Sequence, residues 1–172
     1  MAEPKYLFKG ADFGGNNEIY RYLLWREWDA QKPVIVWIML NPSTADDKVL
    51  DPTLRRCLQF SIDNGYGRME ILNLFALRST DPKLLYGSED PVGWRNDITI
   101  SRACERLGRT VIAAWGAHGV FRNRDKQVID IITKSCRKDL YCLKLNKSGI
   151  PGHPLYVRGD TKISLFRGAI NA

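Results

Sequence analysis

The sequence predicts a single α/β domain, built as three α/β/α layers around a mostly parallel four-stranded sheet. Three observations support this fold class. The chain has 172 residues, the usual size of one domain and too short for two ordinary ones. Runs typical of buried strands alternate with segments whose apolar residues recur at helical spacing. No internal repeat or long linker interrupts the alternation, so residues 1–172 are expected to form one domain.

Four runs carry the pattern of buried strands. Val34 to Leu40 (VIVWIML) is apolar on both faces, which is typical of a central strand of a parallel sheet. The other three predicted strands are Met69 to Leu72, Thr110 to Ala114 and Leu140 to Leu143. The aromatic-rich segment Tyr20 to Trp28 is compatible with an edge strand that feeds the core.

Helical segments lie between these strands. The first predicted helix begins at Asp51-Pro52, where Asp51 can cap it and Pro52 takes the first helical position, and it ends at Asn64-Gly65. Two more helices are predicted, one around Ile98 to Leu107 and one from about Asn123 to Ser135. The polar segment Ser79 to Gly93 is expected to be a loop.

Composition limits the partners and the compartment. Lysine and arginine outnumber the acidic residues 26 to 19, and the net charge of +7 favours an anionic partner, with nucleic acid first. No apolar run has the length of a signal peptide or a membrane span, so we expect a cytoplasmic protein with no membrane partner. The four cysteines include no C-x-x-C pair. We therefore expect reduced thiols and no metal. No cofactor is expected, and the chain is expected to be a monomer.

Polar residues follow each predicted strand. The four strand ends read Asn41-Pro42-Ser43, Asn73-Leu74-Phe75, Trp115-Gly116 and Gly152-His153-Pro154. Taken singly, Asn-Pro is a turn former, a buried Asn often satisfies loop backbone, and a lone His is often a structural hydrogen bonder. Ligands of open α/β sheets bind beyond the carboxyl ends of the strands. The position of all four motifs therefore predicts a site on one rim of the sheet.

The order of these motifs resembles the uracil-DNA glycosylase superfamily. VIVWIMLNPST is similar to its water-activating motif, in the version that carries Asn in place of Asp. EILNLFALRST is similar to its base-reading segment, VIAAWGAHG to its third strand end, and GIPGHPLYVRG to its His-Pro loop. The stretch Val34 to Gly159 also resembles bacterial and phage proteins of domain-of-unknown-function family 1643. The resemblance implies a uracil-DNA glycosylase-like fold.

Three departures from the superfamily pattern are visible. Pro42-Ser43 stands where the superfamily has Pro-Gly or Pro-Tyr, which changes the shape of the surface on which a bound base would lie. Leu155 stands where a Ser follows His-Pro, so a hydroxyl that would grip a phosphate is missing. The cysteine spacing of the iron–sulfur branches is absent.

The resemblance implies a DNA glycosylase that hydrolyses the N-glycosidic bond of uracil or another modified pyrimidine flipped out of DNA. Asn41 would orient a water, Asn73 would read the edge of the pyrimidine, and His153 would donate to the carbonyl of the departing base. A neutral Asn cannot act as a true base, which predicts a slow enzyme. The remaining residues expected to touch the base are Phe75, Pro42 and Ser43.

Two further groups of charged residues are candidates. Asp46, Asp47 and Asp51 follow the first motif and could hold Mg²⁺, although Asp51 is better explained as a helix cap. Asp46 is instead a candidate for the water-activating carboxylate. Arg158, Lys162 and Arg78 are the residues expected to bind DNA phosphates, in which case affinity should fall steeply with salt.

Two other functions stay open at this point. One is a non-catalytic base-recognition module with the same fold, which would bind without releasing a base. The other is a hydrolase of free nucleosides or nucleotides, which would lack the steep salt dependence of DNA binding.

Overall fold

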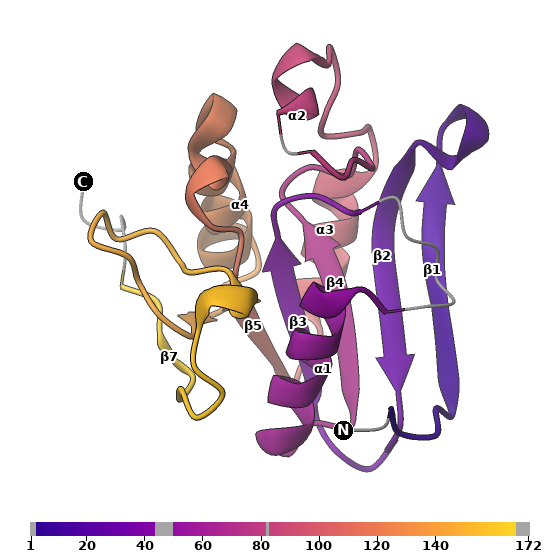
Figure 1. Ribbon diagram of the computed structural model, residues 1–172, viewed down its shortest axis with the longest axis vertical. Coiled ribbons are helices and arrows are strands. Elements are labelled where there is room, and N and C mark those ends of the chain that lie inside the picture. Colours follow the sequence, from indigo (N-terminus) through magenta and orange to yellow (C-terminus); the bar gives the residue numbers. More distant parts are fainter. Residues whose placement is uncertain (1–2, 44–49, 82, 168–172) are drawn as a thin grey trace.

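The computed structural model describes residues 3–43, 50–81 and 83–167, and its centre is one seven-stranded mixed sheet (Figure 1). The strands lie in the order β1-β2-β4-β3-β5-β6-β7. Their bounds are β1 Phe8–Gly14, β2 Tyr20–Glu27, β3 Val34–Met39, β4 Arg68–Asn73, β5 Arg109–Ala113, β6 Leu140–Cys142 and β7 Ser164–Leu165.

Helices cover both faces of the sheet. They are α1 Pro52–Asp63, α2 Leu84–Gly87, α3 Asn96–Glu105 and α4 Arg124–Asp130, the last continued by a π-helical turn, η3 Ile131–Ser135. Three short 3₁₀ turns, η1 Asn16–Glu18, η2 Ala117–Asn123 and η4 Pro154–Tyr156, complete the set. Buried side chains of α1 pack on one face, and those of α3 and α4 pack on the other.

The predicted fold, a mostly parallel four-stranded sheet of the uracil-DNA glycosylase type, is wrong. The four predicted strands correspond to β4, β3, β5 and β6, which are parallel neighbours, but the sheet continues beyond them. On one side β2 pairs antiparallel with β4, and β1 pairs antiparallel with β2. On the other side β7 pairs antiparallel with β6. The segment Tyr20 to Trp28, expected as an edge strand, does form a strand, β2, but β1 takes the edge position. β1 and β7 pair antiparallel and need no helical crossover, so the alternation of strands and helices did not indicate them.

The alternation of side chains along β3 produces two cores. Ile35 and Trp37 face α1, whereas Val36 and Ile38 face α3 and α4. The indole Nε1 of Trp37 donates to the Ser61 hydroxyl of α1 at 3.1 Å, which satisfies the polar atom of a fully buried ring. A strand buried on both faces has to be apolar throughout, which explains the VIVWIM run.

The start of α1 is as predicted. The Asp51 side chain accepts from the Leu54 backbone N–H at 2.8 Å, and Pro52 is the first helical residue. This confirms the predicted cap, and it fixes the end of α1 that lies at the carboxyl end of β3.

The order of the parallel strands creates a crevice at their carboxyl ends. From β3 the chain passes through α1 to β4 on one side, and β5 then lies on the other side of β3. The connections that leave β3 and β5 therefore diverge, because their helices cover opposite faces of the sheet. Such a switch point is where open α/β sheets bind ligands.

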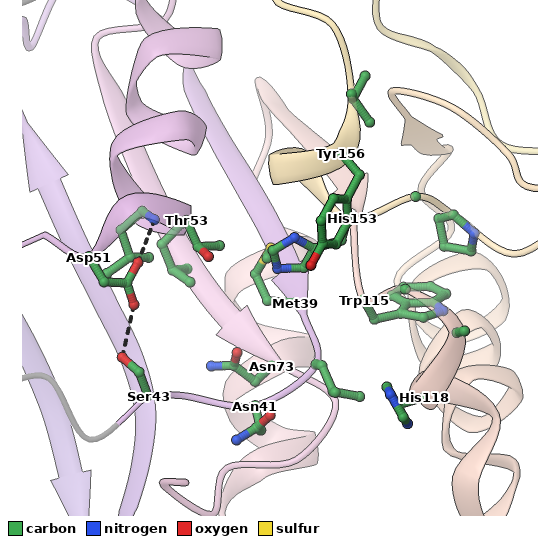
Figure 2. A pocket seen from close by; sticks show the side chains of 18 of the residues that line it. Met39, Asn41, Ser43, Asp51, Thr53, Asn73, Trp115, His118, His153 and Tyr156 are labelled. Atoms are coloured by element: carbon green, nitrogen blue, oxygen red, sulfur yellow. Dashed lines mark hydrogen bonds between the residues drawn. The ribbon is translucent and has the colours of Figure 1, made fainter. Parts of the chain in front are cut away.

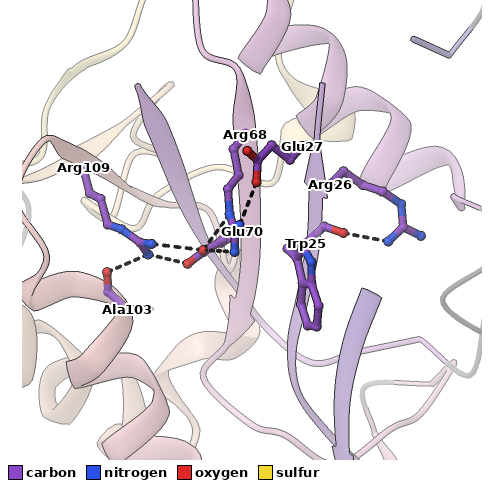
Figure 3. A network of polar contacts seen from close by, with 7 residues as sticks. All are labelled: Trp25, Arg26, Glu27, Arg68, Glu70, Ala103 and Arg109. Atoms are coloured by element: carbon purple, nitrogen blue, oxygen red, sulfur yellow. Dashed lines mark hydrogen bonds and ion pairs between the residues drawn. The ribbon is translucent and has the colours of Figure 1, made fainter. Parts of the chain in front are cut away.

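A buried ion-pair network lies at the opposite end of the same strands (Figure 3). The Glu70 side chain is 3 % exposed. Its carboxylate forms an ion pair with Arg68 at 2.7 Å and accepts hydrogen bonds from both terminal nitrogens of Arg109. Arg109 also donates to the Ala103 carbonyl of α3 at 3.0 Å, and Arg68 reaches Glu27 at 2.9 Å. The network joins β2, β4 and β5 to α3, so its role is to hold the scaffold.

Candidate functional site

The crevice holds a cavity of about 890 Å³ at the carboxyl ends of the parallel strands. This volume suits a small molecule or one nucleotide. Its walls come from the ends of β3, β4, β5 and β6, the start of α1 and the segment around η4 (Figure 2). The residues used below are Arg21, Asn41, Ser43, Asp51, Asn73, Trp115, His118, Lys144, Asn146, Lys147, His153 and Tyr156.

Strand register brings Asn41 and Asn73 to the same wall. Met39 and Asn73 are paired residues on the parallel strands β3 and β4. Side chains two residues apart along an extended chain point to the same side, so Asn41 continues the α1-facing row that contains Met39. Figure 2 shows Asn73 in the middle of the wall, with Ser43 and Asp51 on one side and His153 and Trp115 on the other.

Asn73 carries an unused hydrogen-bond donor. The residue is 2 % exposed, and its amide Nδ2 has no hydrogen-bond partner among the described residues. Leaving such a group buried and unpaired costs about 1–3 kcal/mol. A bound group with an acceptor oxygen, or an ordered water, would recover that energy at this position.

In contrast to Asn73, Asn41 has hydrogen-bond partners for its side-chain amide nitrogen. Its Nδ2 donates to the carbonyls of Pro42 at 3.2 Å and Ser79 at 2.9 Å, which uses both N–H groups of the amide. The Ser79 backbone N–H donates in return to the Pro42 carbonyl at 2.9 Å. Asn41 Oδ1 is therefore the atom of this amide that is left to accept a hydrogen bond from a ligand or a water.

Asp51 is the only carboxylate among the described residues that line the cavity. Its Oδ2 accepts from the Ser43 hydroxyl at 2.9 Å, and its Oδ1 caps α1. Arg21 lines the same cavity, because the antiparallel β2 begins beside the end of β4. Burial lowers the pKa of Arg21 to about 10, and the charge of Asp51 opposes that shift, so Arg21 stays cationic at neutral pH.

His153 precedes η4 and presents a neutral imidazole. Burial lowers the pKa of His153 below its ordinary value of 6.5, against the opposing charge of Asp51. Its Nδ1 accepts from the Leu155 backbone N–H at 3.4 Å, so the neutral ring carries its hydrogen on Nε2 and can donate from there. The segment is tied to α1, because Arg56 donates to the Val157 carbonyl at 2.6 Å.

The aromatic residues of the cavity are Trp115 and Tyr156. Trp115 is buried, whereas Tyr156 is 85 % exposed and its ring centre lies 5.7 Å from that of His153. Phe75, the predicted stacking residue, is fully buried, packs against Phe121 at 5.8 Å and lies outside the cavity. Pro42 is also buried outside the lining, although its carbonyl helps to fix Asn41.

None of the three residues expected to bind phosphate lines the cavity. Arg158 is exposed and forms a bidentate ion pair with Asp160, with N–O distances of 3.1 and 2.9 Å. Arg78 donates to the Glu18 carbonyl at 3.0 Å, and Lys162 lies on the exposed surface beyond η4. Asp46, the candidate water-activating carboxylate, falls outside the described residues.

Several lining residues were missed at the sequence level. The structure adds His118, Lys144, Lys147 and Arg21 to the cavity. His118 was the one with a usable signal. It is one of only two histidines in the chain and lies three residues after Trp115, on the same strand end.

The sequence matches the model of one protein family. A model of proteins of unknown function, DUF1643, matches residues 21–155. The chain belongs to the DUF1643 family. The matched span of DUF1643 contains all of the cavity residues named above except Tyr156 and Val157. No curated protein and no solved structure matches the chain.

Two kinds of feature are absent from the described part of the chain. None of its helices is both long and apolar enough to cross a membrane. Among the same residues, no three His, Cys, Asp or Glu side chains gather in a way that could hold a metal ion. All four cysteines are free thiols.

Proposed function

We propose that the cavity binds a pyrimidine nucleobase flipped out of DNA and that the protein hydrolyses the N-glycosidic bond of that nucleotide. One observation carries the proposal: the buried, unpartnered amide Nδ2 of Asn73 on the cavity wall. Uracil and its relatives present carbonyl oxygens that can accept from this donor. An apolar cavity would not need a buried amide there, because an unsatisfied donor only costs stability.

The reaction needs a positioned water and a donor to the departing base. The water attacks the sugar C1′, the C1′–N bond breaks, and its electron pair stays on the base, which leaves as an anion. Asn41 Oδ1 can hold the water, and the Nε2–H of His153 can donate to the base oxygen as negative charge develops. The proton lost by the water needs an acceptor, and Asp51 is the described carboxylate on this wall.

The motifs support the same chemistry. The segments that end at Asn41, Asn73 and His153 resemble the water-activating, base-reading and His-Pro motifs of the uracil-DNA glycosylase superfamily. All three residues line one cavity. The proposal rests on this placement of side chains, because the sheet itself differs from the predicted one.

A direct assay tests the proposal. The purified protein is incubated with single- and double-stranded oligonucleotides that carry uracil, 5-hydroxymethyluracil, hypoxanthine or a G·T mismatch, and alkali converts abasic sites to strand breaks. We expect cleavage of at least one pyrimidine substrate and its loss in Asn41→Ala and His153→Ala. Asn64→Ala is the matched control, because the Asn64 side chain donates to the Phe60 carbonyl at the far end of α1, away from the cavity. Cleavage that survives in Asn41→Ala and His153→Ala contradicts the mechanism.

A non-catalytic base-binding module is the second candidate, and the Asn41 amide favours it. Asn41 is neutral and both of its N–H groups are bound to backbone, so it cannot take a proton. This candidate predicts binding of the same oligonucleotides, lost in Asn73→Ala, without an abasic product under any condition. Release of a base by the wild-type protein excludes it.

A further inference from the structure

We propose that the β5–β6 side of the cavity is a phosphate-binding subsite formed by Lys144, Lys147 and His118, so that the ligand is a nucleotide whose base lies at Asn73. The inference rests on the proposed function for the identity of the base. It goes further by assigning a second recognition group and the residues that bind it, none of which was expected from the sequence.

The two sides of the cavity differ in charge. The β3–β4 side carries amides, hydroxyls and the carboxylate of Asp51, whose charge is balanced by the nearby Arg21. The β5–β6 side carries the two lysines and no carboxylate among the described lining residues. An unbalanced pair of ammonium groups beside a cavity favours an anionic group of the ligand.

The two lysines are exposed side chains that line the cavity. Some exposed cations elsewhere in the chain are held by carboxylates, for example Lys134 by Asp130 at 2.9 Å and Arg158 by Asp160 at 2.9 Å. Neither Lys144 nor Lys147 has an ion-pair partner among the described residues. Their ammonium groups are therefore available to a ligand without the loss of an existing interaction.

A short hairpin sets the positions of these lysines. Leu145 bridges Pro151, and the Asn146 side chain accepts from the backbone N–H groups of Ser148 and Ile150, both at 2.9 Å. The hairpin is joined to the end of β5, because the Gly116 N–H donates to the Pro151 carbonyl at 3.1 Å. A backbone fixed in this way reduces the entropy lost when the lysines engage a ligand.

His118 completes the subsite from the end of β5. Its Nδ1 is hydrogen-bonded to the Tyr86 hydroxyl at 2.6 Å, which leaves Nε2 as the ring nitrogen for a ligand. Figure 2 shows His118 below Trp115, across the cavity from Ser43 and Asp51.

The spacing of the strands fits a nucleotide. β4 and β6 are separated by β3 and β5 in the sheet, so these two strands are about 14 Å apart at ~4.8 Å per step. Asn73 ends β4, and Lys144 lies two residues beyond β6. From the edge of the base to the phosphate, an extended nucleotide is shorter than the distance between these strands, and the side chains that reach inward from the two sides span the remainder. The base and the phosphate can therefore occupy opposite sides of the cavity together.

The test measures binding rather than catalysis. Isothermal titration compares 2′-deoxyuridine, its 5′-monophosphate and a single-stranded pentanucleotide with one deoxyuridine, using the full chain and the double variant Lys144→Ala/Lys147→Ala. We expect a phosphorylated probe to bind about tenfold or more tightly than the nucleoside, as charge-assisted hydrogen bonds predict. The double variant should bring that ratio close to one with the nucleoside affinity unchanged. Lys126→Ala, on the exposed side of α4, should keep the full ratio.

The source of the phosphate is identified by the probe that binds more tightly than the nucleoside. A higher affinity for the monophosphate identifies a free nucleotide as the ligand. A higher affinity for the pentanucleotide alone identifies a backbone phosphate. The proposal is overturned if the nucleoside and both phosphorylated probes bind alike, if no probe binds, or if the gain survives the double substitution. The lysines are exposed, so these variants should fold, and their melting temperatures verify this.

The variant Asn73→Ala separates this proposal from the proposed function. If the base site exists, Asn73→Ala weakens all three probes, including the nucleoside, which has no phosphate. If Asn73→Ala changes nothing while the lysine-dependent gain persists, the base site fails and the phosphate subsite stands. If only the Asn73 dependence is observed, the phosphate subsite fails and the base site stands.

Discussion

The side chain of Asn96 on α3 holds the backbone of Asn73 from the opposite face of the sheet. Asn96 is fully buried, and its Nδ2 donates to the carbonyls of Asn73 at 3.0 Å and Leu74 at 2.9 Å. Arg124 donates to the same Leu74 carbonyl at 2.8 Å. The end of β4 is thus fixed by side chains that do not touch the cavity, and this leaves the Asn73 side chain in a defined position for a ligand.

Replacing Asn73 by Asp should change which base is accepted. Asp offers only acceptors when ionised, so the cavity would lose its donor for a carbonyl and favour a base with an exocyclic amino group. We expect the preference for uracil over cytosine to fall about tenfold or more, since a good polar contact discriminates bases by about 1–3 kcal/mol. Parallel titrations with uracil- and cytosine-containing oligonucleotides measure the ratio. An unchanged ratio would remove Asn73 from base recognition.

His153→Ala should reduce turnover more than binding, because His153 donates to charge that develops as the base leaves. Burial lowers the pKa of His153 below 6.5, so its donating neutral form predominates at pH 7. Wild-type activity should therefore be level above pH 7. Protonation keeps the donor at Nε2 but turns Nδ1 into a donor that opposes the Leu155 N–H, so activity should decline as the pH falls through the lowered pKa because the ring loses the bond that orients it. Single-turnover rates and dissociation constants across pH 5–8 test this. Equal losses of rate and affinity would make His153 a binding or structural residue.

The same lowered pKa predicts a dependence of stability on pH. Below pH 6.5 the unfolded chain binds a proton at His153 before the folded chain does, so this residue destabilises the fold as the pH falls from 6.5 to the lowered pKa. His153→Ala should remove that part of the decline. Urea denaturation of both proteins at pH 7.5 and 5.5 measures it. Identical pH dependences would show that the His153 pKa is not lowered by burial.

Glu70→Gln should destabilise the fold without changing the cavity. The substitution leaves Arg68 and Arg109 without their shared carboxylate, and breaking a buried pair costs about 3–5 kcal/mol. Urea denaturation measures the loss in the free energy of unfolding, and probe affinity at low temperature should stay the same. Asp160→Asn is the control, because the exposed Arg158–Asp160 pair should contribute nothing measurable.

Gly67→Ala should be among the most damaging single substitutions. A Cβ at Gly67 would lie 1.9 Å from the backbone oxygen of Asp29, which cannot move away as a side chain could. The Gly67 carbonyl also accepts from the N–H groups of Trp28 and Asp29. We expect a loss of more than about 2 kcal/mol in the free energy of unfolding. Gly87→Ala, where a Cβ meets no atom within 4 Å, should be close to neutral.

Hydrophobic patterning located the middle of the sheet but not its edges. β3 is buried on both faces and reads as an apolar run, whereas β1 (FKGADFG) contains two glycines and two charged residues and buries none of them fully. Its place in the sheet comes from backbone pairing with β2, which leaves little trace in side-chain pattern. β7 spans only Ser164–Leu165, too short for any periodicity.

Sequence reasoning found the site residues that lie at or beyond the carboxyl ends of the parallel strands. Asn73 ends β4, Asn41 lies two residues beyond β3, and His153 lies in the segment after β6, so strand order was enough to place them on one rim. Arg21 comes from an antiparallel strand, and Lys144 and Lys147 lie on a hairpin whose fold depends on Asn146. Those residues reach the cavity through tertiary geometry that no local pattern reveals.

The unpartnered amide of Asn73 is unfavourable for folding but favourable for ligand binding. An apolar residue of similar size at this buried position would remove a desolvated donor and stabilise the empty protein. A screen for heat resistance alone would therefore be expected to select such a residue and to lose the cavity's recognition group with it. Thermostable variants of this chain should be chosen with a ligand present, so that the selection rewards the occupied state.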